Sequence, residues 1–498
     1  MTKADYFLSK SKYLAGLQCP KLLWMHYHAK DKFPPTDAGT QATFDQGHQV
    51  TEIYQTLFPG GILIDGEPGD YSGLIKKTQE ALALKKPLFE PAFKFKRSFA
   101  RADILKPNRD GSWDLYEVKS ATSAKDIYYP DVAFQKYCYE GAGIRLRNVF
   151  LVFINNQYIK NGPIDTKALF TQEDVTEKAY ELSQGVEDNI NRMVSILQQK
   201  KCPNIKIGLH CDEPYECALK DMCWDFLPEE NVFKLGGMHK KKAFKLIEEG
   251  TLALKDLKEN YAFTPNQRVQ WECHKKNKAH VRVSEVRSFI EQLEFPLYFL
   301  DFETVGPAIP VYDQSRPYQQ VPFQFSLHIL SGWGKEPLHH GFLAQDKNDP
   351  RPELLSQLRS LIKSKGSVLS YSMGFEIGRL RESVALYSEF AGWLKDVEKR
   401  YLDPMIIFKN FDYYDPKQMG RYSIKNVYPA LTGGSYEGLE IGDGGSASRE
   451  YARVMFSEGI SSQDKERVLR GLEEYCKLDT QAMIDVLDVL KKAAGKKS

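Results

Sequence analysis

The sequence has no long apolar run and almost no net charge, and both absences limit its class. No stretch approaches the roughly 18 to 20 apolar residues of a membrane-spanning helix, so no membrane partner is expected. Residues 1–17 contain no uninterrupted apolar segment, so we expect no signal peptide and a cytoplasmic protein. The formal net charge of +2 gives no overall basic field, although acidic centres would offset a basic rim around a nucleic-acid site.

The chain also lacks the G-x4-G-K-[ST] motif, so we do not expect ATP hydrolysis within it. Its 498 residues exceed what one hydrophobic core usually serves, so two or three domains are expected. In a cytoplasmic protein, the eight cysteines are interpreted as metal ligands, redox residues or buried side chains before disulfides are considered.

The first half of the chain has a mixed α/β pattern. Residues 98–105 predict a strand, residues 107–112 a turn rich in helix-breaking residues, and residues 113–119 a second strand. A helix is expected over residues 131–142, followed by a buried strand over residues 148–155. Another helix is expected over residues 173–200, from its apolar spacing.

A group of chemically active residues follows this hairpin. Asp103 lies near the end of the first strand, and Glu117 and Lys119 are two residues apart on the second, so they point to one face. Two carboxylates can hold a metal ion while the lysine positions water or stabilises developing negative charge. A surface hairpin with a simple Glu/Lys pair is the alternative interpretation.

The helix after the hairpin carries Gln135 and Tyr139 one turn apart. This order of residues resembles the PD-(D/E)XK nuclease superfamily, specifically its RecB-like branch. The resemblance implies a restriction-endonuclease-like domain over residues 1–228 that uses Mg²⁺ or Mn²⁺ to cleave DNA. It implies that Asp103 and Glu117 are metal ligands and that Lys119 is catalytic. Gln135 and Tyr139, the other two residues of the implied catalytic set, would help to hold the site or the DNA.

One ligand of that family is out of place. RecB-like nucleases usually have a metal-binding histidine a few residues after a glycine in an upstream helix. Here Gly47 is followed directly by His48, and Thr51 stands where the histidine commonly falls. His48 or Glu52 could substitute, the site could lack this ligand, or His48 could be a plain exposed histidine.

Three cysteines lie within 13 positions, at Cys211, Cys217 and Cys223, which indicates a metal site. A four-thiolate site needs one more, from Cys202 or Cys19. RecB-like nucleases with an iron-sulfur cluster, including those of CRISPR adaptation, bracket the nuclease core with one N-terminal and three C-terminal cysteines. That resemblance favours Cys19 and a structural [4Fe–4S] cluster, with Zn²⁺ as the alternative. The remaining three cysteines, Cys138, Cys273 and Cys476, are expected to be ordinary buried or partly buried residues.

A second acidic group lies in the last third of the chain. Asp301 and Glu303 alternate on an apolar strand that starts near Pro296, so they share one face. Tyr475 and Asp479 are four residues apart on a helix expected over residues 463–492, and they also share a face.

The D-x-E and Y-x3-D motifs resemble those of the DnaQ-like, or DEDD, 3′–5′ exonucleases, which have the RNase H-like fold. The resemblance implies such a domain over residues 293–498. Glu376 stands where the family usually has an aspartate, and Asp403 is an alternative acid that would otherwise order the following helix. Four residues would hold two metal ions while Tyr475 orients the attacking water: Asp301, Glu303, Glu376 and Asp479.

Residues 229–292 are charged and Lys-rich, and they predict a small helical connector between the two domains. The Gly- and Ser-rich residues 442–448 predict a loop. The sequence therefore favours a bacterial nuclease with two metal-dependent centres. The alternatives are a nucleic-acid-binding assembly module with one or both centres inactive, and an RNA-processing exonuclease. DNA is favoured as the partner, as single strands or duplex ends, and any unwinding of duplex DNA would need a partner such as a helicase.

Overall fold

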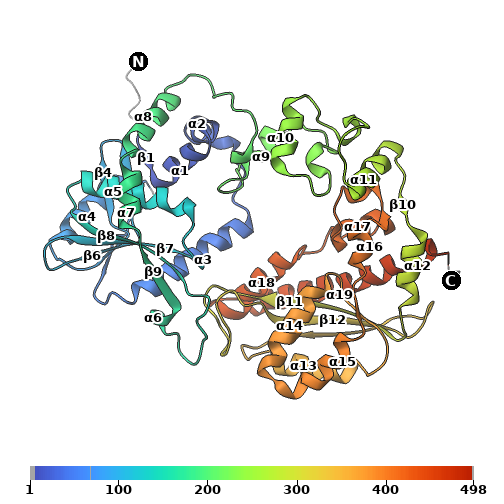
Figure 1. Cartoon of the computed structure of the whole chain (residues 1–498). Coiled ribbons are helices and arrows are strands. Elements are labelled where there is room, and N and C mark those ends of the chain that lie inside the picture. Colours follow the sequence, from blue (N-terminus) through green and yellow to red (C-terminus); the bar gives the residue numbers. More distant parts are fainter. Residues whose placement is uncertain (1–5, 68, 496–498) are drawn as a thin grey trace. The chain divides into compact units, whose positions relative to one another are not determined.

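The computed structural model describes residues 6–67 and 69–495, and the chain divides into two compact units (Figure 1). The first unit extends to Phe226 and the second begins at Leu227. Both units combine helices with mixed sheets, which confirms the predicted α/β class. Residues 229–292, expected to form a separate connector, fall within the second unit. Of the helices in the described residues, none is long and apolar enough to cross a membrane.

The elements of the first unit have the following bounds: β1 Leu8–Ser9, α1 Lys10–Gln18, α2 Pro20–His28, α3 Ala38–Gln55, β2 Ile62–Leu63, α4 Tyr71–Leu82, β3 Leu88–Phe89, β4 Ala92–Phe95, β5 Ser98–Arg101, β6 Ile104–Pro107, β7 Trp113–Lys119, α5 Tyr129–Gly141, β8 Leu146–Ile154, α6 Thr166–Leu169, β9 Phe170–Asp174, α7 Thr176–Ser183, α8 Val186–Leu197 and α9 Lys220–Trp224. The predicted strand at residues 113–119 and the helix near residues 131–142 are confirmed by β7 and α5. The single helix expected over residues 173–200 is wrong at its start, which belongs to β9, and it is interrupted between α7 and α8 around Gly185.

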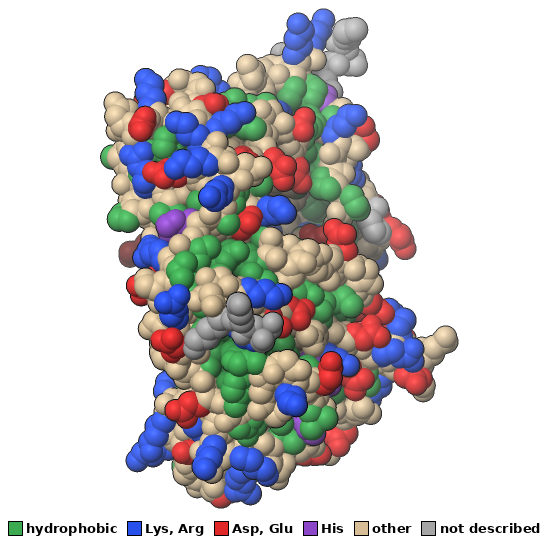
Figure 2. Space-filling model, turned by 90° about the vertical axis from the view of Figure 1, so that its right-hand side faces the viewer, with side chains coloured by type: hydrophobic (Ala, Val, Ile, Leu, Met, Phe, Trp, Pro, Cys, Tyr) green, Lys and Arg blue, Asp and Glu red, His purple; other side chains and the backbone are tan. Residues whose placement is uncertain are grey.

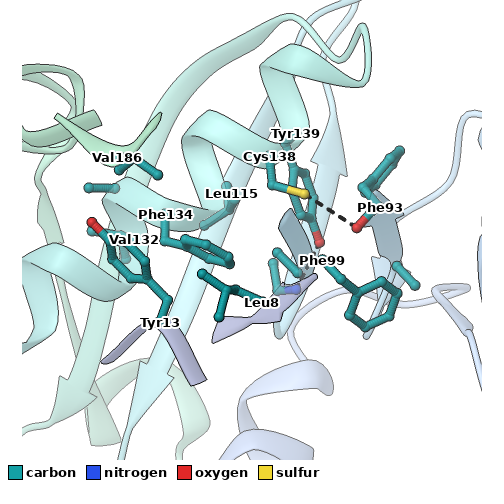
Figure 3. Packing of buried hydrophobic residues seen from close by; sticks show 14 of the residues in the cluster. Leu8, Tyr13, Phe93, Phe99, Leu115, Val132, Phe134, Cys138, Tyr139 and Val186 are labelled. Carbon is teal, nitrogen blue, oxygen red and sulfur yellow. Dashed lines mark hydrogen bonds between the residues drawn. The ribbon is translucent and has the colours of Figure 1, made fainter. Parts of the chain in front are cut away.

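Two sheets form this unit, one with the strand order β2-β3-β6-β7-β8-β9 and one with the order β1-β5-β4. Helix α5 packs beside them, and its buried side chains meet those of the strands and of α1 in one core (Figure 3). Phe134 of α5 stacks on Tyr13 of α1, with ring centroids 4.6 Å apart. The thiol of Cys138 donates to the carbonyl of Phe93, as the dashed line in Figure 3 marks. The core thus fixes α5, and the residues that it carries, against β7.

The strand expected over residues 98–105 is wrong in one respect, because it is two strands. β5 ends at Arg101 and pairs with β4, whereas β6 starts at Ile104 and pairs with β3 and β7 in the other sheet. The chain changes sheets at Ala102 and Asp103. Its backbone hydrogen bonds there go to other partners, since the Ala102 amide donates to the Tyr139 hydroxyl. Asp103 therefore stands at a junction between sheets.

The elements of the second unit have the following bounds: α10 Lys240–Glu248, α11 Pro265–Lys276, β10 His280–Val281, α12 Val283–Glu291, β11 Leu297–Val305, β12 Val321–Leu330, β13 Leu338–Leu343, α13 Arg351–Leu361, β14 Val368–Leu369, α14 Met373–Leu386, α15 Ala391–Glu398, β15 Tyr401–Leu402, α16 Met405–Lys409, β16 Tyr413–Tyr414, α17 Ile424–Thr432, α18 Gly444–Phe456 and α19 Ser462–Ala493. The long C-terminal helix is confirmed. The loop expected at residues 442–448 is wrong from Gly444 onward, because Asp443 caps the N-terminus of α18 there.

A five-stranded sheet with the order β13-β12-β11-β14-β15 is the centre of this unit. β11 pairs antiparallel with β12 and parallel with β14. Helices α13, α14 and α15 lie on one side of β11 and β12, and α18 and α19 lie on the other (Figure 1). Tyr298, Leu300 and Phe302 pack against the first set of helices, and Leu297 and Phe299 against α19. Because strand residues alternate between faces, Asp301 and Glu303 of β11 also point toward α19.

Candidate metal centres

Glu117, on β7, is the residue on which the first acidic group converges. Its side chain is only 2% exposed. Its Oε1 accepts hydrogen bonds from the ammonium groups of Lys119 and Lys10, both at 2.7 Å, and its Oε2 accepts one from the Gln135 amide at 2.7 Å. The sequence analysis placed Lys119 and Gln135 in one site with Glu117. It gave no indication of Lys10, which precedes Glu117 by 107 residues.

Asp131 is a further acid of this group that the sequence analysis missed. It lies on α5 one turn before Gln135, and it is 4% exposed. Its Oδ2 accepts from Lys119 Nζ at 2.7 Å, and its Oδ1 accepts from Gln135 Nε2 at 2.9 Å. The four-residue spacing from Gln135 was a usable signal. Asp131 therefore fixes the positions of both the lysine and the amide beside Glu117.

Asp103 and Tyr139 are connected through the backbone at the junction between the sheets. Asp103 Oδ2 accepts a hydrogen bond from the Val118 amide at 2.6 Å, which holds its carboxyl beside β7. The Tyr139 hydroxyl accepts from the Ala102 amide at 2.8 Å and donates to the Pro91 carbonyl at 2.5 Å. Tyr139 is fully buried. Of its two expected roles, holding the site agrees with this position and contact with DNA does not.

Burial and the neighbouring charges change the pKa values of the acids and the lysine in this group. Burial raises the pKa of Asp103 well above its usual range, and the nearby Glu117 carboxylate raises it further. Burial alone would lower the pKa of Lys119, but Asp131 and Glu117 outweigh it and hold that pKa well above its ordinary value. Lys119 is therefore a permanent ammonium, suited to stabilising an anion rather than to accepting a proton.

Glu90 is another acid near this centre that the sequence did not indicate. It has a positive φ of 54°, unusual for a residue other than glycine, and its amide donates to the Asp103 carbonyl. Burial raises its pKa, while Arg101 opposes that rise and Glu117 adds to it. The His48 imidazole also acts on this carboxyl, and His48 itself is exposed on α3, as is Glu52.

The four cysteines favoured by the sequence gather in one place. They line a single pocket: Cys19, Cys211, Cys217 and Cys223. Burial raises the pKa of the Cys19 thiol, and Cys211 and Cys223 add to that rise, so the thiols are close enough to repel one another when ionised. Cys202, the other candidate for the fourth position, packs against this group without lining the pocket.

The spacing of these thiols bears on the choice of metal. Four sulfurs bound to one zinc ion at about 2.3 Å lie about 3.8 Å from one another. In the described part of the chain, only the triad Asp301, Glu303 and Cys476 has ligand atoms that all lie within 4.8 Å of one another, so no three of the thiols are that close. Four thiolates suit either an iron-sulfur cluster or Zn²⁺, so both remain candidates for this pocket.

In the second unit, Asp301 and Glu303 point toward α19, as the alternation along β11 requires. Their carboxylate oxygens and the sulfur of Cys476 on α19 all lie within 4.8 Å of one another. Cys476 Sγ is 3.7 Å from Asp301 Oδ2. Burial, followed by repulsion from Asp301, raises the pKa of the Cys476 thiol well above its ordinary value, so it stays protonated and donates. This agrees with its expected role as a buried residue.

Asp479 reaches the same place from α19, one turn after Tyr475. It is 7% exposed, and its Oδ1 accepts a hydrogen bond from the Tyr436 hydroxyl at 2.7 Å. Burial raises the pKa of Asp479, although hydrogen bonds from Tyr436 and Tyr475 oppose that rise. Tyr436, in the segment between α17 and α18, is a member of the site that no motif indicated.

Glu376, in the first turn of α14, is 4% exposed, and its Oε2 has no hydrogen-bond partner in the described part of the chain. A buried carboxylate oxygen without a partner is costly unless a cation or a proton satisfies it. Asp403 instead accepts hydrogen bonds from the amides of Ser372, Met373 and Met405. It caps α14 and α16, so the expectation that it orders the following helix is confirmed.

The pKa values show that the four acids act on one another. Burial is the largest cause in each case, and it raises the pKa of Glu303 to about 8 and that of Glu376 to about 8. The pKa of Asp301 is raised well above its usual range by burial and by its acidic neighbours, led by Asp479. Three buried carboxyls and the partly exposed Asp301 repel one another, and together they form a donor set that Mg²⁺ or Mn²⁺ would neutralise.

Three of these carboxyls open into a pocket of about 540 Å³, which Glu376 does not line. Asp301, Glu303 and Asp479 line it, together with Tyr475 and Lys425 of α17. The Lys425 ammonium lies 4.7 Å from the centroid of the Tyr475 ring. The pocket therefore presents carboxylates and a cation side by side, an arrangement that suits a metal ion and an anionic ligand together.

Comparisons with known proteins give a family model and two distant relatives. A domain of unknown function (DUF2779) matches residues 298–423, from Tyr298 in β11 to Ser423, which directly precedes α17. The uncharacterized protein MG366 of Mycoplasma genitalium is 24% identical over 438 residues, covering 75% of this chain and 64% of that protein. The uncharacterized protein UU173 of Ureaplasma parvum is 25% identical over 246 residues, covering 44% of this chain and 34% of that protein. The chain thus spans less than two thirds of these curated relatives, and its likeness is to uncharacterised bacterial proteins.

Proposed function

We propose that this protein is a metal-dependent nuclease that hydrolyses phosphodiester bonds at two centres, one in each unit. The observation that carries the proposal is that residues distant in sequence meet in two buried acidic groups. Glu117, Lys119 and Gln135 meet in the first unit, and Asp301, Glu303 and Asp479 meet in the second. Isolated surface acids would not have raised pKa values of this kind.

In the first centre, Asp103 and Glu117 would hold Mg²⁺ or Mn²⁺, and a bound ion would lower the pKa of water and neutralise charge on the phosphate. Lys119 supplies a fixed positive charge beside Glu117. Gln135 and Asp131 keep Glu117 and Lys119 in place, and Tyr139 holds the backbone before Asp103. These contacts support a restriction-endonuclease-like assignment for this unit.

In the second centre, Asp301, Glu303, Glu376 and Asp479 would hold the metal ions, with the same chemistry. Tyr475, a hydrogen-bonding neighbour of Asp479, would orient the attacking water. The mixed sheet with β11 at its centre is what we would expect of an RNase H-like fold, which supports this assignment. The proposed activity here is exonucleolytic.

The four converging cysteines would bind a [4Fe–4S] cluster that ties the two ends of the first unit together, because Cys19 lies before the first centre and the other three follow it. Zn²⁺ remains the competing metal. The partner of both centres would be nucleic acid, with DNA favoured over RNA.

Cleavage of end-labelled single-stranded DNA, duplex DNA and RNA in the presence of Mn²⁺ tests this proposal. Lys119→Met and Asp301→Asn should each remove one activity, and the double variant should remove both. Lys125→Met and Asp346→Asn, which change exposed residues of the same type, are the matched controls and should cleave like the wild type.

A double variant that degrades all three substrates as the wild type does would contradict the proposal. Metal-dependent binding without turnover by the wild type would favour the rival function, a nucleic-acid-binding assembly module with inactive centres. Cleavage confined to RNA would identify an RNA-processing exonuclease.

A further inference from the structure

Positive charge is concentrated in one short segment of the second unit. Residues 239–278 contain ten Lys and Arg residues against five Asp and Glu, whereas the whole chain has a net charge of only +2. On the face of the molecule shown in Figure 2, basic and acidic side chains are interspersed, in keeping with that low total. The segment contains α10 and α11. Its charge is therefore a local feature that the net value conceals.

The segment rests on a small core of its own. Trp271 of α11 packs with Leu254, Leu257 and Ala243 of α10. α11 begins with a capping box between Thr264 and its third residue, which fixes the start of the helix. The side chains on its surface are therefore presented by a rigid base.

Three cations of this segment lie over aromatic rings in a continuous row. Lys242 Nζ is 4.5 Å from the centroid of Tyr261, and the guanidinium of Arg268 is 4.5 Å from that of Phe263 and 5.2 Å from that of Trp271. Lys275 Nζ is 4.6 Å from the Trp271 centroid. The rings also touch one another, since Tyr261 and Phe263 are 4.8 Å apart and Phe263 and Trp271 are 5.3 Å apart. We call these six residues the cation–aromatic row.

The cations of the row have no carboxylate partner among the residues that the structure describes, unlike their neighbours on the same helices. Lys245 pairs with Glu249, and Lys276 pairs with Glu272. Lys242, Arg268 and Lys275 are instead held by ring faces, apart from one hydrogen bond from Arg268 to the Glu259 carbonyl. A cation–π contact positions a cation without neutralising its charge. Most of their N–H donors therefore remain available to an external anion.

We infer that the cation–aromatic row binds the phosphates of a nucleic-acid backbone, an inference that rests on the proposed function. Three fixed cations on a rigid base suit a repeating line of phosphates. Contacts with phosphates carry no sequence information, so this binding is independent of sequence. A membrane surface fits less well, because it favours exposed aromatic side chains that insert among the lipids.

Equilibrium binding of fluorescent single-stranded and duplex DNA, measured by anisotropy in EDTA so that nothing is cleaved, tests this inference. The test variant is Lys242→Gln/Arg268→Gln/Lys275→Gln. The control is Lys335→Gln/Lys347→Gln/Lys395→Gln, which removes the same charge from exposed residues elsewhere in the second unit. Between about 50 and 200 mM salt, the test variant should reduce the slope of log affinity against log salt by about 2 to 3. The control should keep the slope of the wild type.

A third variant, Lys242→Arg/Lys275→Arg, keeps the charge and should retain the slope, which separates loss of phosphate contacts from damage to the fold. Equal losses in the test and control variants would overturn the inference, as would binding to anionic phospholipid vesicles in place of DNA. An unchanged slope in a protein that still cleaves would overturn the inference alone. Failure of the wild type to bind any nucleic acid would overturn both the inference and the proposed function.

Discussion

Glu303 provides the sharpest prediction, because its environment should make the metal-free protein less stable as the pH rises. Burial and the neighbouring acids raise its pKa from the ordinary 4.5 to about 8. Below pH 4.5 the carboxyl is protonated in both the folded and the unfolded state. Between the two values the folded protein keeps a proton that the unfolded chain has lost, so the free energy of unfolding falls as pH increases.

The size of this effect follows from the same two values. Each pH unit between them is worth about 1.4 kcal/mol, which gives a ceiling of about 5 kcal/mol above pH 8. Glu303→Gln has nearly the same shape and never ionises. Without metal, this variant should match the wild type at acidic pH and be more stable by several kcal/mol at pH 8, up to that ceiling.

Urea unfolding in EDTA across this pH range, repeated with Mn²⁺, measures both parts of the prediction. Mn²⁺ should stabilise the wild type, because it replaces the protons of the acidic group, and should stabilise Glu303→Gln much less. Glu336→Gln, which changes an exposed glutamate between β12 and β13, is the control and should follow the wild type. The reasoning is refuted if Glu303→Gln is less stable than the wild type in EDTA at pH 8, or if its response to Mn²⁺ is undiminished.

Three further predictions concern the first unit. Asp131→Asn should lower the cleavage rate of the first centre by about 10- to 100-fold, because Lys119 loses its anchor; unchanged kinetics of that centre would contradict this. Tyr139→Phe should cost about 1 to 3 kcal/mol in urea unfolding, because a buried amide and carbonyl lose their common partner; a change below about 0.5 kcal/mol would contradict that role. Cys19→Ser should lose bound iron or zinc in elemental analysis while Cys202→Ser retains it, and equal metal content in the two variants would contradict the assignment of the fourth thiolate.

Local pattern predicted much of the second centre. The alternation along β11 placed Asp301 and Glu303 on one face, and the four-residue spacing placed Tyr475 and Asp479 on one face of α19. The acidic face of β11 meets this face of α19 because Leu297 and Phe299, on the same side of the strand, pack against α19. Leu300 and Phe302 point the other way and pack against the helices on the opposite side of the sheet. Period and burial alone therefore determined these side-chain directions.

Contacts between distant segments were beyond the sequence. Lys10 reaches Glu117 because β1 pairs with β5 and thereby sets the start of α1 beside β7, and no local pattern contains that pairing. Tyr436 reaches Asp479 from a segment without regular structure, for which no periodicity exists. Asp131 is different, since its position one turn before Gln135 was visible and its meaning depended only on knowing which face of α5 is buried.

Two of the secondary-structure predictions are wrong for the same physical reason. In each case a side-chain oxygen accepts the hydrogen bond of a backbone amide. The strand predicted over residues 98–105 breaks because Tyr139 takes the Ala102 amide. The loop predicted at residues 442–448 becomes α18 because the Asp443 carboxylate accepts the amide of Ser446 and offsets the poor helix propensity of the glycines. Apolar periodicity carries no information about such bonds.

The most direct test of the two-centre account is the position of bound metal. Crystals grown with Mn²⁺ and measured at its absorption edge should give anomalous peaks beside Asp103 and Glu117 in the first unit, and among Asp301, Glu303 and Asp479 in the second. Crystals saturated with Mn²⁺ that show no peak at either group would contradict the account.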